Sequence, residues 1–211
     1  MVRFIHILTL AAAALVSACG SGADSDRTSS GDNATQGELS AVESAAIVFL
    51  REEEKLARDV YRSLAPLDSQ VFTNIAQSEQ SHMDAVAVLL ARYGLSDPAA
   101  GRAEGSFANP DLQALYDTLV TSGRGATVEA WKVGAEIEEL DLRDLASMRA
   151  NATRTDVLAT LDQLARGSRN HLRAFYGKLT AAGVAYAPKY ISEAELRAIV
   201  TSPTEAGGGM R

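Results

Sequence analysis

Glu79 and His82 are the residues from which we begin, because their types and spacing suit metal binding. They stand three positions apart within the stretch 78–83, inside an apolar repeat of helical period. On a helix, positions i and i+3 lie on the same face, so this carboxylate and this imidazole can reach one metal ion from adjacent turns. Charged helices also produce this spacing by chance. The pair therefore predicts a metal site only if other helices supply further ligands.

The composition is that of a soluble protein with one apolar core. The chain has 211 residues, of which 46% are apolar and 22% are charged, so we expect one domain plus terminal segments. The net charge of −7 excludes nucleic-acid binding through a basic surface, since phosphate contacts need clustered Lys and Arg. The three histidines are His6, His82 and His171.

Residues 1–18 are predicted to be a signal peptide and not part of the fold. Arg3 gives the start a positive charge, and the apolar run 4–16 is too short for a membrane-spanning helix. Small residues then lead into Cys19, the only cysteine, which resembles the lipobox of a bacterial lipoprotein. This resemblance implies that Cys19 is lipidated and becomes the mature N-terminus. The alternative is an ordinary signal peptide followed by an incidental cysteine.

The predicted location follows from this leader. We expect an exported bacterial lipoprotein, anchored to the membrane of the cell envelope on the periplasmic side. That compartment is oxidising, yet a single cysteine allows no internal disulfide. Residues 19–38 are polar and predict a disordered tether, residues 39–200 a folded domain, and residues 201–211 a flexible tail.

The first predicted helix carries a glutamate in its apolar stripe. It begins with a capping box at Ser40 and ends before Pro66. Its apolar positions recur at intervals of three and four, and Glu53 falls on this line. Glu54 falls to the side, where it can pair with Arg58 at the surface.

Three more long helices carry polar residues on their apolar lines. They are predicted at about 71–93, from Thr127, and from about Thr155. Ser168 also lies on the last of these lines, three residues before a histidine. Over the four helices, the candidate metal ligands are Glu53, Glu79, His82, Glu138, Asp141 and His171.

The connection between the second and third of these helices is long. It spans residues 95–126 and contains a short predicted helix at 110–120. A crossover of this length is what a ferritin-like bundle uses, whereas an up-down-up-down bundle needs only short loops. A short helix capped by Ser192 follows near the C-terminus. The predicted fold class is therefore all-α: a ferritin-like four-helix bundle with a long crossover and a short C-terminal helix.

The combination of ligands argues for metal more strongly than any single helix does. A glutamate on one stripe can reach solvent, and a buried histidine is usually a hydrogen-bonded core residue. Four carboxylates and two imidazoles in one bundle interior, however, would be costly to bury without a cation. Carboxylate-rich sites with two nitrogen ligands suit a pair of iron or manganese ions.

Four blocks of the sequence resemble an uncharacterised bacterial family of the ferritin-like superfamily. They are residues 51–61, 78–86, 137–141 and 167–175, and the resemblance covers about 40–199. It implies a four-helix ferritin-like fold. It implies no activity, because the function of the family is unknown.

The wider di-iron group uses Glu, Glu-x-x-His, Glu and Glu-x-x-His along its four helices. Resemblance to it assigns the positions Glu53, Glu79 with His82, Glu138 and His171. This sequence departs from the pattern at Ser168, where the second motif has glutamate. Asp141 could supply the missing carboxylate from the neighbouring helix. A mononuclear site and a pair of ions with unequal affinity are also compatible with the sequence.

Two functions are compatible with these features. The first is a lipid-anchored metalloprotein with two iron ions, or manganese, that reacts with oxygen or peroxide as an oxidoreductase of the ferroxidase or oxidase type. The second is a non-catalytic envelope lipoprotein, a bundle for binding or assembly with structural metal or none. No protein partner can be inferred from the sequence.

Overall fold

The computed structural model describes residues 38–206, and this part of the chain is helical, with six helices and no strand. The predicted all-α class is confirmed. None of the helices in the described part has the length and apolar character needed to cross a membrane. The helices are α1 (Ala41–Leu64), α2 (Ser69–Arg92), α3 (Pro110–Gly123), α4 (Thr127–Asn151), α5 (Thr155–Ala181) and α6 (Glu193–Thr201).

Several predictions concern residues outside this range. The signal peptide (1–18), the lipidation site Cys19 and the tether up to residue 37 lie outside the described residues, as do residues 207–211. Export and lipid anchoring therefore remain predictions.

Local signals in the sequence place the helix ends. Ser40 Oγ accepts a hydrogen bond from the Glu43 N–H at 3.1 Å, and Glu43 Oε2 accepts one from the Ser40 N–H at 3.0 Å, which completes the predicted capping box. Asn109 caps α3 through its side chain, with Pro110 in the first turn. Gly94 follows α2 with φ 64°, a left-handed conformation that glycine adopts without strain.

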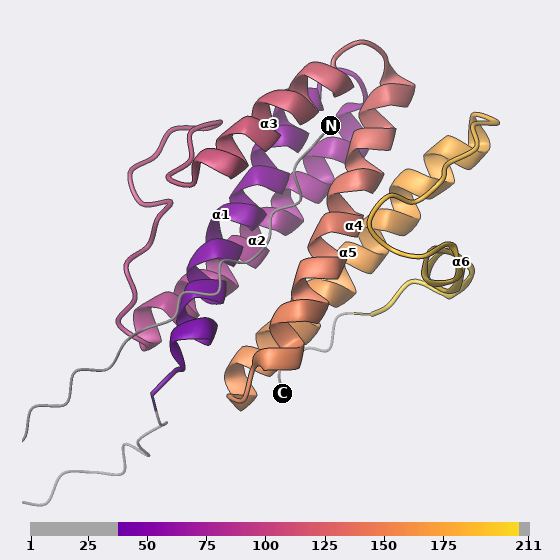
Figure 1. Cartoon of the computed structure of the whole chain (residues 1–211). Coiled ribbons are helices and arrows are strands. Elements are labelled where there is room, and N and C mark those ends of the chain that lie inside the picture. Colours follow the sequence, from indigo (N-terminus) through magenta and orange to yellow (C-terminus); the bar gives the residue numbers. More distant parts are fainter. Residues whose placement is uncertain (1–37, 207–211) are drawn as a thin grey trace, which may run out of the picture. The chain divides into compact units, whose positions relative to one another are not determined.

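The four long helices form two antiparallel pairs, as Figure 1 shows. α1 packs on α2, and α4 packs on α5; the pairs then contact each other through α1 with α4 and α2 with α5. The connection after α2, together with α3, carries the chain back along the bundle before α4 begins (Figure 1). α3 packs on α1 and α4, and α6 packs on α5. The predicted long crossover and short C-terminal helix are confirmed.

Charged residues of α1 hold the crossover in place. Glu52 accepts hydrogen bonds from the backbone N–H groups of Ala108, at 2.5 Å, and Asn109, at 2.9 Å. Lys55 forms an ion pair with Asp59, and both residues also hydrogen-bond to backbone groups of the crossover. Lys55 is 1% exposed and Asp59 is fully buried. α1 is therefore covered on more sides than its apolar stripe alone indicates.

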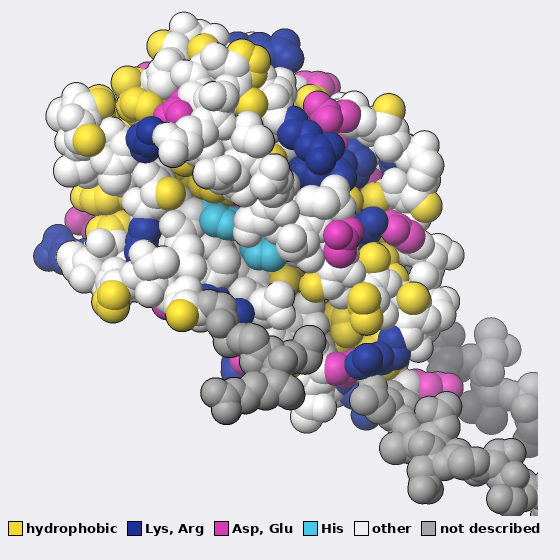
Figure 2. Space-filling view, turned by 180° about the vertical axis from the view of Figure 1, so that it is seen from behind, with side chains coloured by type: hydrophobic (Ala, Val, Ile, Leu, Met, Phe, Trp, Pro, Cys, Tyr) yellow, Lys and Arg dark blue, Asp and Glu magenta, His cyan; other side chains and the backbone are white. Residues whose placement is uncertain are grey.

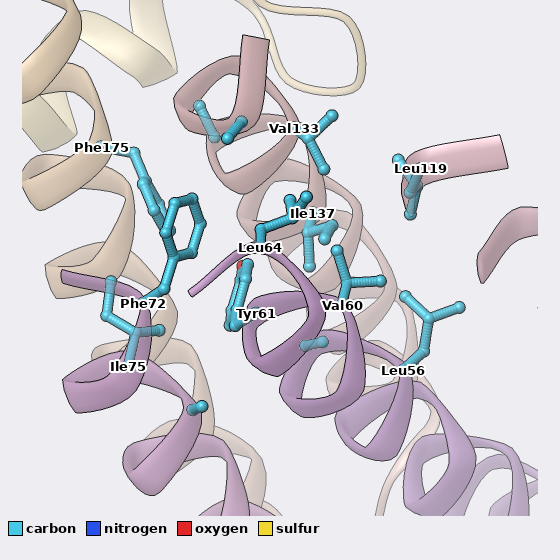
Figure 3. Packing of buried hydrophobic residues seen from close by; sticks show 14 of the residues in the cluster. Leu56, Val60, Tyr61, Leu64, Phe72, Ile75, Leu119, Val133, Ile137 and Phe175 are labelled. Atoms are coloured by element: carbon cyan, nitrogen blue, oxygen red, sulfur yellow. The ribbon is translucent and has the colours of Figure 1, made fainter. Parts of the chain in front are cut away.

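The apolar core is divided into two clusters. One contains Tyr61, Phe72 and Phe175, whose ring centroids are 5.4–5.9 Å apart (Figure 3). The other includes Leu50 and Leu161 and lies toward the opposite ends of the same helices. Along each of the four long helices, the candidate metal ligands fall between the residues of one cluster and those of the other. The core therefore has a polar layer near its middle.

Glu43 ties the start of α1 to the α4–α5 connection. Its Oε1 accepts hydrogen bonds from the Thr153 N–H at 2.7 Å and from Thr153 Oγ1 at 3.0 Å. The hydrogen bond from the Thr153 backbone, followed by those with Ser40 and the Thr153 side chain, outweighs burial and lowers the pKa of Glu43 from 4.5 to about 2. The charged form is therefore bound more favourably in the folded state than in the unfolded state.

We predict that Glu43→Gln lowers the free energy of unfolding at pH 7 by about 2 kcal/mol, the scale of hydrogen bonds to a charged group. A carboxylate whose pKa is lowered by folding stabilises the protein above its unfolded pKa and loses this effect as the pH falls toward the folded value. The difference between the two proteins should therefore shrink from pH 4.5 toward about 2 in denaturant titrations. The exposed Glu129→Gln is the control; a difference that does not depend on pH would contradict the assignment.

Candidate metal centre

The polar layer contains two groups of residues that could each hold a metal ion. Glu54, Glu79 and His82 form one group, and Glu79, Glu138 and His171 form the other. Within each group, one donor atom from every residue lies within 4.8 Å of the others, and all members are buried. α1, α2, α4 and α5 all contribute, and Glu79 belongs to both groups.

Glu79 faces a different histidine with each of its two oxygens. Its Oε2 lies 2.7 Å from His82 Nδ1, and its Oε1 lies 2.8 Å from His171 Nδ1. The second carboxylate near His82 Nδ1 is Glu54, with Oε2 at 3.2 Å. The second near His171 Nδ1 is Glu138, with Oε2 at 3.5 Å. Each side of Glu79 is therefore completed by one glutamate and one histidine.

Unpaired buried atoms in both groups are compatible with the binding of a cation. Glu54 Oε1, Glu79 Oε1 and His171 Nδ1 are buried and have no hydrogen-bond partner. Glu79 Oε1 and His171 Nδ1 are 2.8 Å apart but form no hydrogen bond with each other. An unpaired buried polar group costs about 1–3 kcal/mol, and a cation between these atoms would remove that cost. Carboxylate oxygen and imidazole nitrogen together suit iron, manganese or zinc.

Neighbouring groups fix both imidazoles. His171 Nε2 lies 2.9 Å from Ser78 Oγ, so a proton on Nε2 that is donated to this serine leaves the Nδ1 lone pair facing the carboxylates. The His82 ring packs against Gly167, where a Cβ atom would overlap its Nε2 and Cε1. The two imidazole rings are stacked, with centroids 5.7 Å apart.

Tyr61 orients the carboxylate of Glu138. Its hydroxyl donates a hydrogen bond to Glu138 Oε1 at 2.5 Å, which leaves Oε2 facing His171. Burial, followed by the charge of Glu138, raises the pKa of Tyr61 well above 10, so this hydroxyl keeps its proton. Sequence reasoning missed Tyr61. Its position seven residues after Glu54, two turns along the same face of α1, was the available signal.

The charges in the layer depend on one another. Burial raises the pKa of Glu54 to about 7, although His82 opposes this shift. The pKa of Glu79 is shifted in the opposite direction. Burial would raise it, but the charges of the two nearby histidines have the larger effect and lower it. The pKa of His171 is raised to about 10 because Glu79 and Glu138 outweigh its burial. The pKa of His82 is also raised, so without a cation protons on the two histidines offset part of the carboxylate charge, and metal binding would release them.

Four of the six residues predicted from the sequence come together in the two groups: Glu79, His82, Glu138 and His171. On α1, Glu54 and not Glu53 is a member. The expectation that Glu54 is a surface residue paired with Arg58 is wrong, because Glu54 is 2% exposed and Arg58 donates to Asp59 instead. The physical reason is that α2 and the crossover cover the flanks of α1, so its apolar stripe does not mark its whole buried surface.

Asp141 and Glu53 lie beside the two groups. Asp141 is buried, and its Oδ2 accepts a hydrogen bond from Ser168, the residue that stands where the second Glu-x-x-His motif has glutamate. Glu53 is half-buried and interacts with Asp144 and Asp141. Neither residue contributes a donor atom to the groups that contain the histidines.

Gly167 provides a test of the histidine packing. We predict that Gly167→Ala lowers the free energy of unfolding of the metal-free protein by about 1 kcal/mol, because overpacking costs about 1–3 kcal/mol and exceeds the helix-propensity gain. Gly177→Ala, on the same helix with nothing within 4 Å of the added Cβ, should stabilise by about 0.5–1 kcal/mol. Chemical denaturation measures both. Equal stabilisation by the two changes would show that His82 does not lie against Gly167.

Comparisons with known proteins place the chain in a family. An uncharacterized protein of Methanocaldococcus jannaschii, MJ0754, is 45% identical over 170 residues, which cover 80% of this chain and 92% of that protein. The crystal structure of hypothetical protein MJ0754 superposes with a TM-score of 0.79 and 43% identity, covering 82% of this chain and all of that one. This relative is from an archaeon, so the expectation that the family is bacterial was too narrow. The profile of the uncharacterized protein domain DUF2202 matches residues 43–203, and the chain belongs to that family.

Proposed function

We propose that this chain is a ferritin-like metalloprotein that binds two iron ions, or two manganese ions, in the polar layer of its bundle and reacts with oxygen or peroxide. The observation that carries the proposal is the position of Glu79, with each oxygen facing a separate glutamate–histidine pair. A carboxylate in this position is suited to bridge two ions. The bundle and its crossover have the arrangement typical of di-metal carboxylate proteins.

The residues divide into two sets of ligands and one bridge. Glu54 and His82 would hold one ion, and Glu138 and His171 would hold the other, while Glu79 would contact both. The three glutamates neutralise most of the charge of two divalent cations, which lowers the cost of placing them in an apolar core. A pair of iron ions bound here would supply electrons for the reduction of oxygen or peroxide.

The surrounding residues keep the ligands in position. Tyr61 holds Glu138, and Ser78 holds His171, so the side chains that face the centre are held in position before a cation arrives. The apolar clusters shield the centre from water toward both ends of the bundle.

The histidine side of the centre lies nearest to solvent. His82 is 5% exposed and His171 is 8% exposed. Figure 2 shows histidine side chains reaching the molecular surface on the side of the bundle turned away from Figure 1. A small oxidant therefore has only a short distance to travel from this surface to the imidazoles. The layer combines buried ligands with access for small molecules.

The N-terminal segment adds a proposal about location. If residues 1–18 are a signal peptide and Cys19 is lipidated, the bundle would lie on the periplasmic side of a bacterial membrane, held by a lipid anchor.

The central test of function is iron binding followed by oxygen uptake. We predict that metal-free protein binds about two ferrous ions per chain without oxygen and consumes oxygen when it is admitted, as expected for a paired carboxylate site. Elemental analysis and an oxygen electrode measure these quantities. The double variant Glu79→Ala with His82→Ala should lose both iron binding and oxygen uptake, because it removes the glutamate shared by the two groups and one histidine. Glu129→Gln, an exposed change, is the control.

The outcomes separate the possible roles of the metal. Two bound ions without oxygen uptake would show that the metal is structural and would refute the proposed chemistry. No stoichiometric binding, or unchanged binding in the double variant, would refute the metal centre itself.

We also predict that bound metal stabilises the fold. At a free manganese concentration of about 100 times the dissociation constant, the free energy of unfolding should rise by about 2.7 kcal/mol for each site of that affinity. Thermal denaturation with and without a chelator measures this change. A melting temperature that does not respond to the chelator would contradict the prediction.

A further inference from the structure

The turn of α5 that faces the candidate metal centre is built from residues that form helices poorly. It contains Gly167, Ser168, Asn170 and His171, and all four residue types have a lower helix propensity than alanine. In proteins, most of the stability of a helix comes from tertiary packing. This turn therefore depends on contacts with other parts of the chain to stay in place.

The inner face of this turn contacts the centre on both sides of Glu79. His171 is a member of one group, and its Nδ1 lies 2.8 Å from Glu79 Oε1. Gly167 packs against the ring of His82, a member of the other group, so closely that an added Cβ would overlap the ring. A displacement of this one turn would therefore disturb both histidines.

The outer face of the same turn holds the C-terminal segment. Arg169 forms a bidentate ion pair with Glu205, with Nε 2.7 Å from Oε1 and Nη2 2.6 Å from Oε2. Asn170 binds the main chain of the same glutamate: its Nδ2 donates to the Glu205 carbonyl at 3.0 Å, and its Oδ1 accepts from the Glu205 N–H at 2.9 Å. Glu205 is thus fixed through both its side chain and its main chain.

Arg173, one turn further along α5, ties this segment to the end of α6. Its Nη2 lies 3.0 Å from Glu205 Oε1 and 2.6 Å from Ser202 Oγ, and its Nε donates to the Ile199 carbonyl at 2.9 Å. The Arg173 side chain is 11% exposed, so these bonds are screened less than those of an ordinary surface ion pair. Residues 202–206, which we call the strap, are therefore fastened along the outside of α5.

We propose that the strap positions the turn of α5 that carries the metal-facing residues, and that Glu205 is a positioning residue for His171 and His82. This inference rests on the proposed function and deepens it. Arg169 stands two positions before His171, about 200° around the helix axis, so it faces away from the centre. The bonds to Glu205 and the contacts with the histidines therefore act on one turn from opposite sides.

The strap affects both the metal-free and the metal-bound protein. In the metal-free protein, its bonds oppose local unfolding of the turn. Ligands that are ordered before binding also lose little conformational entropy when an ion arrives. A fastened strap would therefore hold His171 in place for an ion and slow the release of that ion.

The test compares hydrogen exchange and Co²⁺ release in the full-length protein with and without Glu205→Ala. In the metal-free variant, the backbone amides of residues 167–175 should exchange about tenfold faster, because opening of the turn no longer breaks charge-assisted bonds. In the Co²⁺-loaded variant, the ligand-field absorption should shift, and release to a chelator should be about tenfold faster. Circular dichroism verifies that the variant is folded.

The matched control is Asp162→Ala. It also removes a carboxylate that pairs with an arginine, because Asp162 of α5 binds Arg149 of α4 at the exposed surface, 2.5 Å away. This variant should change neither the exchange of residues 167–175 nor the release of Co²⁺.

Each outcome decides a separate point. If Glu205→Ala leaves the exchange of residues 167–175 unchanged, the strap fastens only itself and α6, and the positioning role is overturned. Faster exchange of these residues with unchanged absorption and Co²⁺ release would overturn it as well, since the turn would then loosen without effect on the histidines. Failure of the unmodified protein to bind Co²⁺ would instead refute the proposed function, while the exchange experiment, which needs no metal, still decides whether the strap holds the turn.

Discussion

The structure depends on a layer of buried charge across the middle of a helical bundle. Five candidate ligand side chains from four helices converge there, and the apolar core is divided into one cluster on each side. Burying such charges costs several kcal/mol per ion unless partners compensate. The bundle therefore has to supply partners from all four helices at once, and Glu79 connects them because it faces both histidines. Cations held by these residues would complete what the hydrogen bonds leave unpaired.

The crossover contributes to this layer although it carries none of its ligands. Glu52, Lys55 and Asp59 of α1 hold the crossover through buried hydrogen bonds and an ion pair. This contact covers the flank of α1, the helix that presents Glu54 to the centre. The position of one ligand is thus linked to the path of a long connection. The same packing leaves Glu53 at the margin, half-buried and facing Asp141 and Asp144.

Most of the fold could be predicted from the sequence because its signals are local. Capping residues, apolar periodicity and the position of Gly94 predicted the helices and the crossover. The ligands on α2, α4 and α5 could be found because the apolar stripes of those helices coincide with the faces that meet in the layer. The stripe of α1 favoured Glu53 over Glu54, and this was wrong because α1 is buried on several sides through tertiary contacts. Tyr61 was missed because its role depends on a hydrogen bond to Glu138 on another helix.

The central claim is that Glu79 would hold both of two metal ions, and anomalous scattering from manganese-soaked crystals tests it most directly. The geometry predicts two peaks, about 3.5–4 Å apart as in other two-metal sites, one beside Glu54 and His82 and the other beside Glu138 and His171. Both peaks should lie within bonding distance of the Glu79 carboxylate. A single peak at one histidine, or two peaks of which one does not contact Glu79, would contradict the claim.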